Sequence, residues 1–136
     1  MKVAVLTETF PSEQRVALVP ANVPHLAKAG LDVVIEAGAG ADAGFLDSGV
    51  TEKGARIVSR DELFEADIGA QVRTLGASKD AGRGDLGKLR SGQFVRGMCD
   101  PLGGPASAVE IAETGASLFA LEMIPRITRA QSMDIL

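Results

Sequence analysis

The run Lys2-Val-Ala-Val-Leu6 is almost wholly apolar, and similar runs recur along the 136-residue chain. A strand that is buried on both faces, as in a parallel sheet, has this continuous apolar pattern. Helical stretches lie between the runs, and strands that alternate with helices are typical of a parallel sheet with helices on both faces. The sequence therefore predicts an α/β fold with about five strands, at Lys2 to Leu6, Asp32 to Ile35, Ala66 to Val72, Gln93 to Met98 and Ser117 to Met123.

Proline and glycine residues indicate where the helices and the loop between these strands begin and end. Pro20 begins a helical stretch that Gly30 closes. A second helix is predicted over Pro101 to Gly115, where apolar residues share roughly one face. The Gly-rich span from Gly76 to Gly92 predicts a long loop with one short turn of helix. Its role stays open between a solvated connection and a segment that a partner covers.

A shorter unit precedes the third predicted strand. Ile57 and Val58 indicate a brief strand, and Ser59 follows with Glu62 three residues later. This spacing forms a capping box, in which each side chain bonds the other residue's backbone N–H, and it predicts a short helical turn.

Composition excludes several classes of function. The chain has 46% hydrophobic and 24% charged residues, as one ordinary globular domain would. A net charge of −4 without a basic patch argues against a nucleic-acid partner. With one Cys, Cys99, and one His, His25, we expect no internal disulfide and no metal site. We interpret both as structural residues. Without a signal peptide or a run of about 18 apolar residues, we expect a chain in a reducing compartment that neither is secreted nor spans a membrane.

The stretch Gly38-Ala-Gly40-Ala-Asp-Ala43 has the spacing of a dinucleotide-binding turn. That turn requires a helix that opens at the second glycine, so that its N-terminal amides meet the pyrophosphate. The residues from Gly44 to Gly49 are a poor helix sequence, so we interpret the stretch as ordinary structure.

Arg15 is the one charged residue in the apolar stretch that follows Gln14, in the loop after the first strand. Ligands of open α/β sheets bind outside the carboxyl ends of the strands, where this loop lies. Its guanidinium suits a carboxylate or a phosphate, which makes Arg15 a candidate site for a substrate-like anion. Alternatively, Arg15 pairs with Glu8 or Glu13 and fixes the loop.

The segment Met123 to Asp134 is dense with arginines, an amide and a carboxylate, directly after an apolar strand. These side chains provide the donors and acceptors that ribose hydroxyls and a carboxamide require. The alternative is a solvated polar tail.

Three motifs give the chain a family resemblance. They are Glu13-Gln-Arg-Val-Ala-Leu-Val-Pro20, Glu36-Ala-Gly-Ala-Gly40 and Pro125-Arg-Ile-Thr-Arg-Ala-Gln-Ser-Met-Asp134. Together they make residues 1–136 resemble the alanine dehydrogenase and transhydrogenase N-terminal domain family, and the last motif resembles the nicotinamide-facing loop of the transhydrogenase alpha subunit. The resemblance implies a Rossmann/flavodoxin-like sheet in a proton-translocating NAD(P) transhydrogenase, which transfers hydride between NAD(H) and NADP(H).

The resemblance also implies roles for individual residues of the last motif. Gln131 is expected at the reactive nicotinamide as the catalytic residue, while Arg126 and Asp134 help to bind NAD. Residues with less defined cofactor-binding roles are Thr128, Arg129 and Ser132.

The same resemblance implies that this segment does not act alone. We expect NAD to be shared with a Rossmann domain that carries the true GxGxxG turn and lies outside these residues. We also expect a helix to return to this domain from the far end of the subunit. The expected partners are the NAD-binding, membrane and NADP-binding components and a second copy in a homodimer. The expected location is cytoplasmic, peripheral to a membrane complex.

Two alternatives remain beside this hypothesis. An oxidoreductase fragment like alanine dehydrogenase would use an Arg, a Lys and a His for its keto acid, and only Arg15 is present. Gln71 stands where the Lys belongs, and no His follows the strand at Gln93 to Met98, so the chemistry lacks an acid or base. The other alternative is a truncated, non-catalytic α/β module that binds partner subunits.

Overall fold

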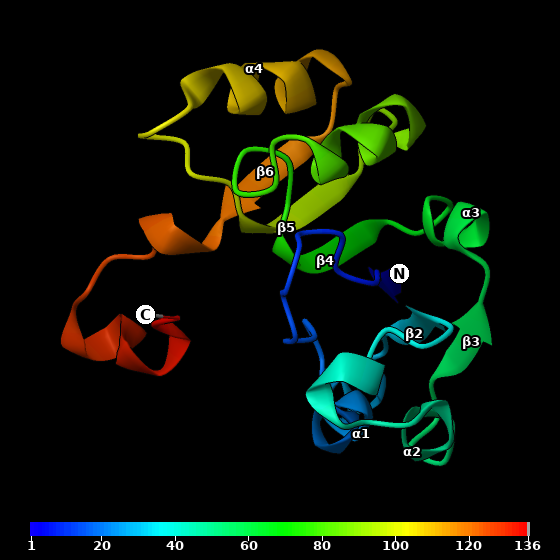
Figure 1. Cartoon of the computed structure of the whole chain (residues 1–136). Helices are drawn as coiled ribbons and strands as arrows, with labels where there is room; N and C mark the ends of the chain where they lie inside the picture. The colour runs from blue at the N-terminus through cyan, green and yellow to red at the C-terminus, as the bar shows by residue number, and fades with distance from the viewer. Residues whose placement is uncertain (136) are drawn as a thin grey trace.

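The computed structural model describes residues 1–135 and contains one six-stranded sheet in which every strand runs parallel to its neighbours (Figure 1). The strand order is β3-β2-β1-β4-β5-β6. The strands are β1 Lys2–Val5, β2 Asp32–Glu36, β3 Arg56–Val58, β4 Ile68–Arg73, β5 Phe94–Met98 and β6 Ser117–Ala120. The predicted α/β class is confirmed, and the expected strand number was one too low.

The additional strand is the brief one expected at Ile57 and Val58. It pairs with β2, with Ile57 beside Ile35, and so forms one edge of the sheet. The last strand is shorter than predicted, because β6 ends at Ala120 and Leu121–Met123 turns as a 3-10 helix.

Within residues 1–135, four short α-helices and five 3-10 helices lie between the strands or after the last one. The capping box at the start of α3 is confirmed, since Ser59 Oγ accepts the Glu62 N–H at 3.5 Å and the Glu62 carboxylate accepts the Ser59 N–H at 3.1 Å. The α-helices are α1 Val23–Lys28, α2 Asp47–Thr51, α3 Arg60–Leu63 and α4 Pro105–Glu113. The 3-10 helices are Pro20–Asn22, Ala41–Ala43, Ala81–Lys88, Leu121–Met123 and Thr128–Met133.

The helices cover the two faces of the sheet unequally (Figure 1). On one face, α1 and α2 pack over β1 to β3 around Val5, Val23 and Ile35. On the other face, α3, the Ala81–Lys88 helix and α4 form a layer, from which Leu63 packs against Ala4 and Ile111 packs in one cluster with Val95. Among the described residues, no helix covers the α1 face of β5 and β6, so this part of the sheet is open.

Candidate functional site

The strand order reverses between β1 and β4, and ligands of open α/β sheets bind at the carboxyl ends of the strands on either side of such a point. Here the Glu8 carboxylate, in the loop after β1, accepts the backbone N–H groups of Val72 at 2.6 Å and Arg73 at 3.0 Å. Burial raises the pKa of the Glu8 carboxyl, although both hydrogen bonds favour its charged form. Glu8 therefore ties this loop to the end of β4.

Glu13 completes the cluster at this point. Its side chain is only 5% exposed, and it accepts Nε and Nη2 of Arg15 at 2.7 Å each and Nε of Arg73 at 2.8 Å. The hydrogen bonds from Arg15 are the main reason why the pKa of the Glu13 carboxyl is lowered to about 2. The Arg73 guanidinium also lies 4.4 Å from the centre of the Phe10 ring. Arg15 is thus paired with Glu13, one of the two partners that the sequence offered.

A second polar network lies at the end of β2. Arg60 Nη1 donates to Glu36 at 2.6 Å, and Arg60 Nε and Nη2 donate to the Asp85 carboxylate at 3.1 and 2.6 Å. Glu36 also accepts the Thr7 N–H at 2.8 Å. A carboxylate at the end of β2 holds the ribose in dinucleotide-binding sheets. Here Glu36 instead bonds the loop after β1 and Arg60 of α3, and Arg60 in turn bonds Asp85 of the Ala81–Lys88 helix.

The glycine stretch after β2 has a structural role. Only the three-residue 3-10 helix Ala41–Ala43 follows Gly40, and the Gly38 N–H donates to Asp47 at 3.0 and 3.1 Å. A Cβ on Gly40 would lie 2.9 Å from the Phe45 carbonyl oxygen, so the glycine is required by close packing. A helix long enough to hold a pyrophosphate does not begin here.

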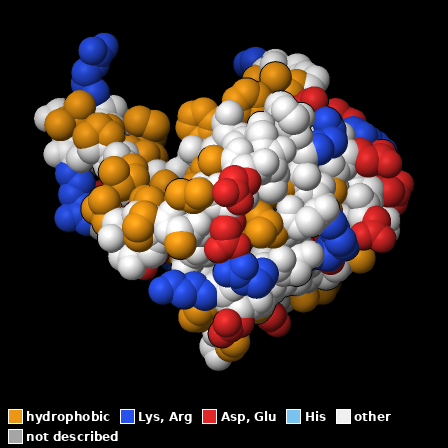
Figure 2. Space-filling model, turned by 90° about the horizontal axis from the view of Figure 1, so that it is seen from above, with side chains coloured by type: hydrophobic (Ala, Val, Ile, Leu, Met, Phe, Trp, Pro, Cys, Tyr) orange, Lys and Arg blue, Asp and Glu red, His pale blue; other side chains and the backbone are white. Residues whose placement is uncertain are grey.

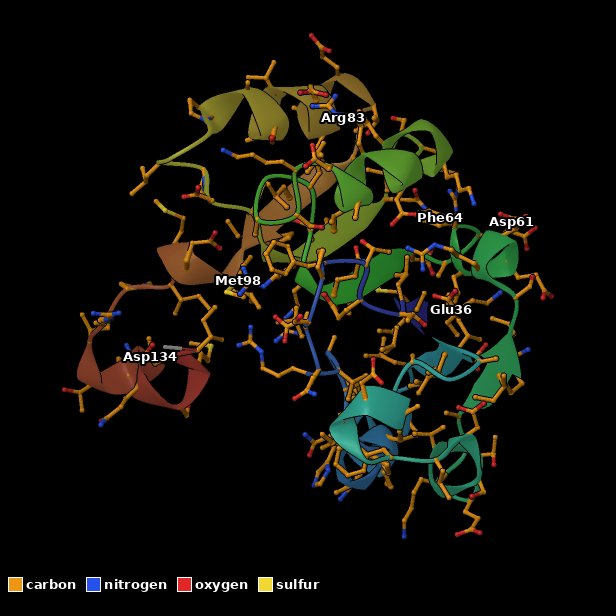
Figure 3. All side chains as sticks on the ribbon, viewed as in Figure 1. Glu36, Asp61, Phe64, Arg83, Met98 and Asp134 are labelled. Atoms are coloured by element: carbon orange, nitrogen blue, oxygen red, sulfur yellow. The ribbon has the colours of Figure 1, made fainter. Side chains whose placement is uncertain are left out.

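Two clefts open at the carboxyl edge of the sheet and share Met98, which is labelled in Figure 3. We call the first, of about 410 Å³, the Arg15 cleft. It is lined by Arg15, Val16, Ala17, Val19, Ala43, Phe45, Gln71, Val72, Arg96, Met98, Leu121 and Ile135. Because Ile135 belongs to the C-terminal segment, the end of the tail and Arg15 meet at this cleft.

The second cleft, the Glu122 cleft, has a volume of about 640 Å³ and lies where β4, β5 and β6 end. Glu122 accepts the backbone N–H of Cys99 at 2.7 Å and that of Asp100. Its second carboxylate oxygen and the Ser78 hydroxyl are buried without a hydrogen-bond partner among the described residues. Residues that line it are Phe10, Pro11, Arg73, Gly76, Ala77, Ser78, Lys79, Asp80, Ala81, Met98, Asp100 and Glu122.

Sequence reasoning did not identify Glu122 or Ser78 as site residues, or Glu8 and Glu13 as anchors of Arg73. Glu122 follows directly after the apolar run of β6, which was the one available signal. Gln71, at the position where alanine dehydrogenase would need a Lys, is 8% exposed and its Nε2 has no partner in the described part of the chain.

The tail contrasts with these networks, because its side chains point into solvent. Seen from above, the molecule divides into two lobes, and hydrophobic side chains gather on the left lobe, where the tail lies (Figure 2). The exposed apolar residues of this segment include Met123, Ile127 and Met133, and Ala130 is its buried anchor. The six predicted cofactor-binding residues are all exposed: Arg126, Thr128, Arg129, Gln131, Ser132 and Asp134.

One ion pair joins the ends of the tail motif. Arg126 Nε lies 3.7 Å from Asp134 Oδ2, and the two side chains are 65% and 35% exposed. Figure 3 shows Asp134 on the tail, apart from the packed side chains around Glu36. The fold thus brings Arg126 and Asp134 together, while no described contact joins Gln131 to Arg15.

The single Cys and the single His differ in exposure. Cys99 is fully buried, as predicted, and burial raises the pKa of its thiol. His25 is exposed on α1. Within residues 1–135, no group of three acidic, His or Cys side chains is placed to hold a metal ion. No helix in this range is long and apolar enough to cross a membrane.

An all-parallel sheet in the order 3-2-1-4-5-6, with clefts at its carboxyl edge, defines a Rossmann-like α/β domain. Residues 4–136 match the family described as alanine dehydrogenase/PNT, N-terminal domain. The chain belongs to this family.

Individual relatives agree with this assignment. The chain is 38% identical to the NAD(P) transhydrogenase subunit alpha of Cereibacter sphaeroides, over 100% of the chain and 25% of that relative. Its fold is similar to the crystal structure of transhydrogenase from Sinorhizobium meliloti, with a TM-score of 0.91 and 36% identity over 100% of the chain and 39% of that structure. An L-alanine dehydrogenase structure shares the fold, with a TM-score of 0.83 and 23% identity over 95% of the chain and 34% of that structure. The chain therefore spans well under half the length of these proteins.

Proposed function

We propose that this chain contributes the tail Pro125 to Asp134 to the NAD(H) site of a proton-translocating NAD(P) transhydrogenase. The observation that carries the proposal is the exposure of the polar side chains in the tail. Its residues Arg126, Thr128, Arg129, Gln131 and Ser132 are exposed, in a chain that is 38% identical along its whole length to a transhydrogenase alpha subunit. Buried polar side chains would be structural, whereas exposed ones can reach a ligand.

The donor set of the tail fits a nicotinamide nucleotide. Arg126 provides a fork of N–H donors, and the Asp134 carboxylate can accept hydrogen bonds from ribose hydroxyls. The Gln131 amide has the donor and acceptor that pair with a carboxamide. When bound, the nicotinamide supplies or accepts the hydride. The tail would bind and orient it, with Gln131 against the ring and Thr128, Arg129 and Ser132 around the rest of the nucleotide.

The same proposal includes partners, since the described residues contain no long helix N-terminus for the pyrophosphate at the glycine stretch. A Rossmann domain would hold most of NAD, and the membrane and NADP-binding components would complete the enzyme. We propose that the chain functions within this complex as a homodimer on the cytoplasmic side, peripheral to the membrane, and is inactive alone. The open face of β5 and β6 supports the expectation that a helix from elsewhere in the subunit packs on this domain.

The first test is calorimetric titration of the 136-residue chain with NADH. We expect weak or absent binding, because the helix N-terminus that would hold the pyrophosphate belongs to the proposed partner domain. Binding in the low micromolar range by the chain alone would show that no partner domain is required.

The second test is single-turnover hydride transfer in a reconstituted complex. Gln131→Asn keeps the amide and shortens its reach, so NADH should still bind. Transfer should slow about a hundredfold, because a misplacement on the order of 1 Å has this effect when catalysis is chiefly orientation. The matched control is Gln14→Asn in the exposed loop after β1. Transfer at the parent rate by Gln131→Asn would remove Gln131 from the site.

Arg126→Ala tests binding in the same complex. Loss of a charge-assisted contact of roughly 1.5 to 3 kcal/mol should raise the dissociation constant for NADH by tenfold or more. Arg56→Ala, at the exposed sheet edge, is the control for lost charge. If the two variants bind NADH equally well, Arg126 does not contact the nucleotide.

A further inference from the structure

The tail begins at a carboxylate that is bonded to the sheet. β6 ends at Ala120, the 3-10 helix Leu121–Met123 turns the chain, and the tail beyond it lies beside the sheet rather than on it (Figure 1). In the middle of this turn, Glu122 Oε1 accepts the backbone N–H of Cys99 at 2.7 Å and also that of Asp100. Both donors lie directly after β5, so Glu122 joins the start of the tail to the neighbouring strand.

The backbone that Glu122 bonds is shaped around one acceptor. Asp100 has a φ of 49°, a left-handed conformation that residues other than glycine rarely adopt. The N–H groups of two successive residues converge there on one carboxylate oxygen, as they do in the backbone nests that bind anions. Hydrogen bonds to an ionised acceptor are roughly twice as strong as neutral ones. The Glu122 carboxylate therefore has a specific place at the end of β5.

The other contacts of the tail restrain it in a different way. Its backbone hydrogen bonds Ile124 to Leu121 at 3.1 Å and Ala130 to Ile127 at 2.9 Å, which links tail residues to one another. Ala130 is buried and Ile135 lines the Arg15 cleft, and apolar burial of this kind is not directional. The directional bonds of Glu122 therefore set the angle at which the tail leaves the sheet.

We infer that Glu122 is a positioning residue for the tail. Its carboxylate holds the Leu121–Met123 turn against the end of β5 and thereby sets where Gln131 lies. The inference rests on the proposed function of the tail, since Glu122 acts on hydride transfer through Gln131 and not by contact with the nucleotide. A catalyst that works by orientation is sensitive to such a support, because a shift on the order of 1 Å can change the rate about a hundredfold.

Two substitutions at position 122 separate the acceptor from the rest of the side chain. Glu122→Gln keeps an oxygen acceptor at the same reach, whereas Glu122→Ala leaves the N–H groups of Cys99 and Asp100 without it. Glu113→Ala is the matched control, because it removes an exposed carboxylate at the end of α4. Circular dichroism verifies that each variant is folded.

The first measurement uses the full chain without nucleotide. Nitroxide labels are attached at Ile127→Cys and Lys53→Cys, both exposed positions, while the native Cys99 is fully buried. Pulsed electron paramagnetic resonance gives the distribution of distances between the labels. We expect Glu122→Ala to broaden or shift it, and Glu122→Gln and Glu113→Ala to leave it unchanged. A second label pair at Lys53 and Ala112, outside the tail, should not change in any variant.

The second measurement is single-turnover hydride transfer in the reconstituted complex. Glu122→Ala should slow transfer about tenfold or more, because the tail is misplaced. The dissociation constant for NADH should change by less than about threefold, since the partner domain is proposed to hold most of the nucleotide. Glu122→Gln should restore the parent rate. A merely structural role would lower the amount of folded complex and leave the rate of the folded fraction unchanged.

Three results would overturn the inference. They are an unchanged distance between the labels in Glu122→Ala, a rate that Glu122→Gln does not restore, and transfer at the parent rate by Glu122→Ala. Gln131→Asn distinguishes the last result from failure of the proposed function. If Gln131→Asn is slow while Glu122→Ala is not, only the role of Glu122 is wrong. Parent rates in both variants would remove the tail itself from the nicotinamide site.

Discussion

Polar side chains gather at two places near the carboxyl edge of the sheet, and the two groups differ in how they use their hydrogen bonds. Around the ends of β1, β2 and β4, the carboxylates of Glu8, Glu13 and Glu36 accept hydrogen bonds of 2.6 to 3.1 Å from backbone N–H groups and from arginine side chains. In the tail, the ion pair of Arg126 with Asp134 spans 3.7 Å. The carboxylates at the position that usually holds the ligand in such sheets are therefore bonded within the chain itself, whereas the donors of the tail are exposed.

This difference distinguishes the polar side chains that stabilise the fold from those that we propose to bind a ligand. A partly buried charge that is fully paired stabilises the fold mainly because removal of its partner leaves it unpaired. An exposed charge in a weak pair contributes little to folding. Substitutions in the first group should therefore affect stability, and those in the tail should affect binding alone.

The largest expected effect is that of Arg60→Met, which leaves the Glu36 and Asp85 carboxylates, 18% and 15% exposed, without their cation. We expect a loss of about 3 kcal/mol in the free energy of unfolding, measured with urea. Lys88→Met is the matched control, because the pair of Lys88 with Asp61 joins the same two helices. Since Lys88 and Asp61 are 40% and 84% exposed, their separation should change stability by less than about 1 kcal/mol. Equal losses in both variants would refute the distinction.

A smaller, pH-dependent effect is expected at Glu13. Its pKa is about 2 in the folded chain, below the ordinary 4.5, so its contribution is present above about pH 4.5 and is lost as the pH falls toward 2. Glu13→Gln should cost about 1 to 2 kcal/mol at pH 7, because two arginines lose their acceptor. The difference from the parent should shrink as the pH approaches 2. A difference independent of pH would show that the Glu13 charge is not responsible.

Much of the fold could be predicted from the sequence, because the central strands are continuous apolar runs with little ambiguity. The sequence pattern predicts β3 only as a brief strand, since Arg56 is exposed at the sheet edge and three residues give a weak pattern. The Ala81–Lys88 helix lies in the Gly-rich span, where a loop with one short turn of helix was predicted, and it is longer than one turn. Its glycines disfavour a helix, but Leu86 packs against the core.

The site was less predictable than the fold. The Glu8 carboxylate bonds residues 64 and 65 positions away, and such contacts leave no local pattern in the sequence. Glu122 likewise bonds backbone groups 22 and 23 positions earlier. The tail was found because its polar residues lie close together in the sequence, and its role in NAD binding stays a prediction.

The smallest expected effect is on the stability of the chain when the tail pair is broken. Arg126→Gln removes a contact of 3.7 Å in which Arg126 is 65% exposed, so water already solvates most of the guanidinium. Because exposed pairs of this kind contribute about 0 to 1 kcal/mol and the tail packs mainly through Ala130, we expect a change within about 0.5 kcal/mol. Urea unfolding at low and high salt measures it, beside Arg60→Met as the sensitive reference. The same variant should weaken NADH binding in the complex. A loss of stability above about 1 kcal/mol would instead place Arg126 among the residues that hold the fold, and the tail would then be a structural segment.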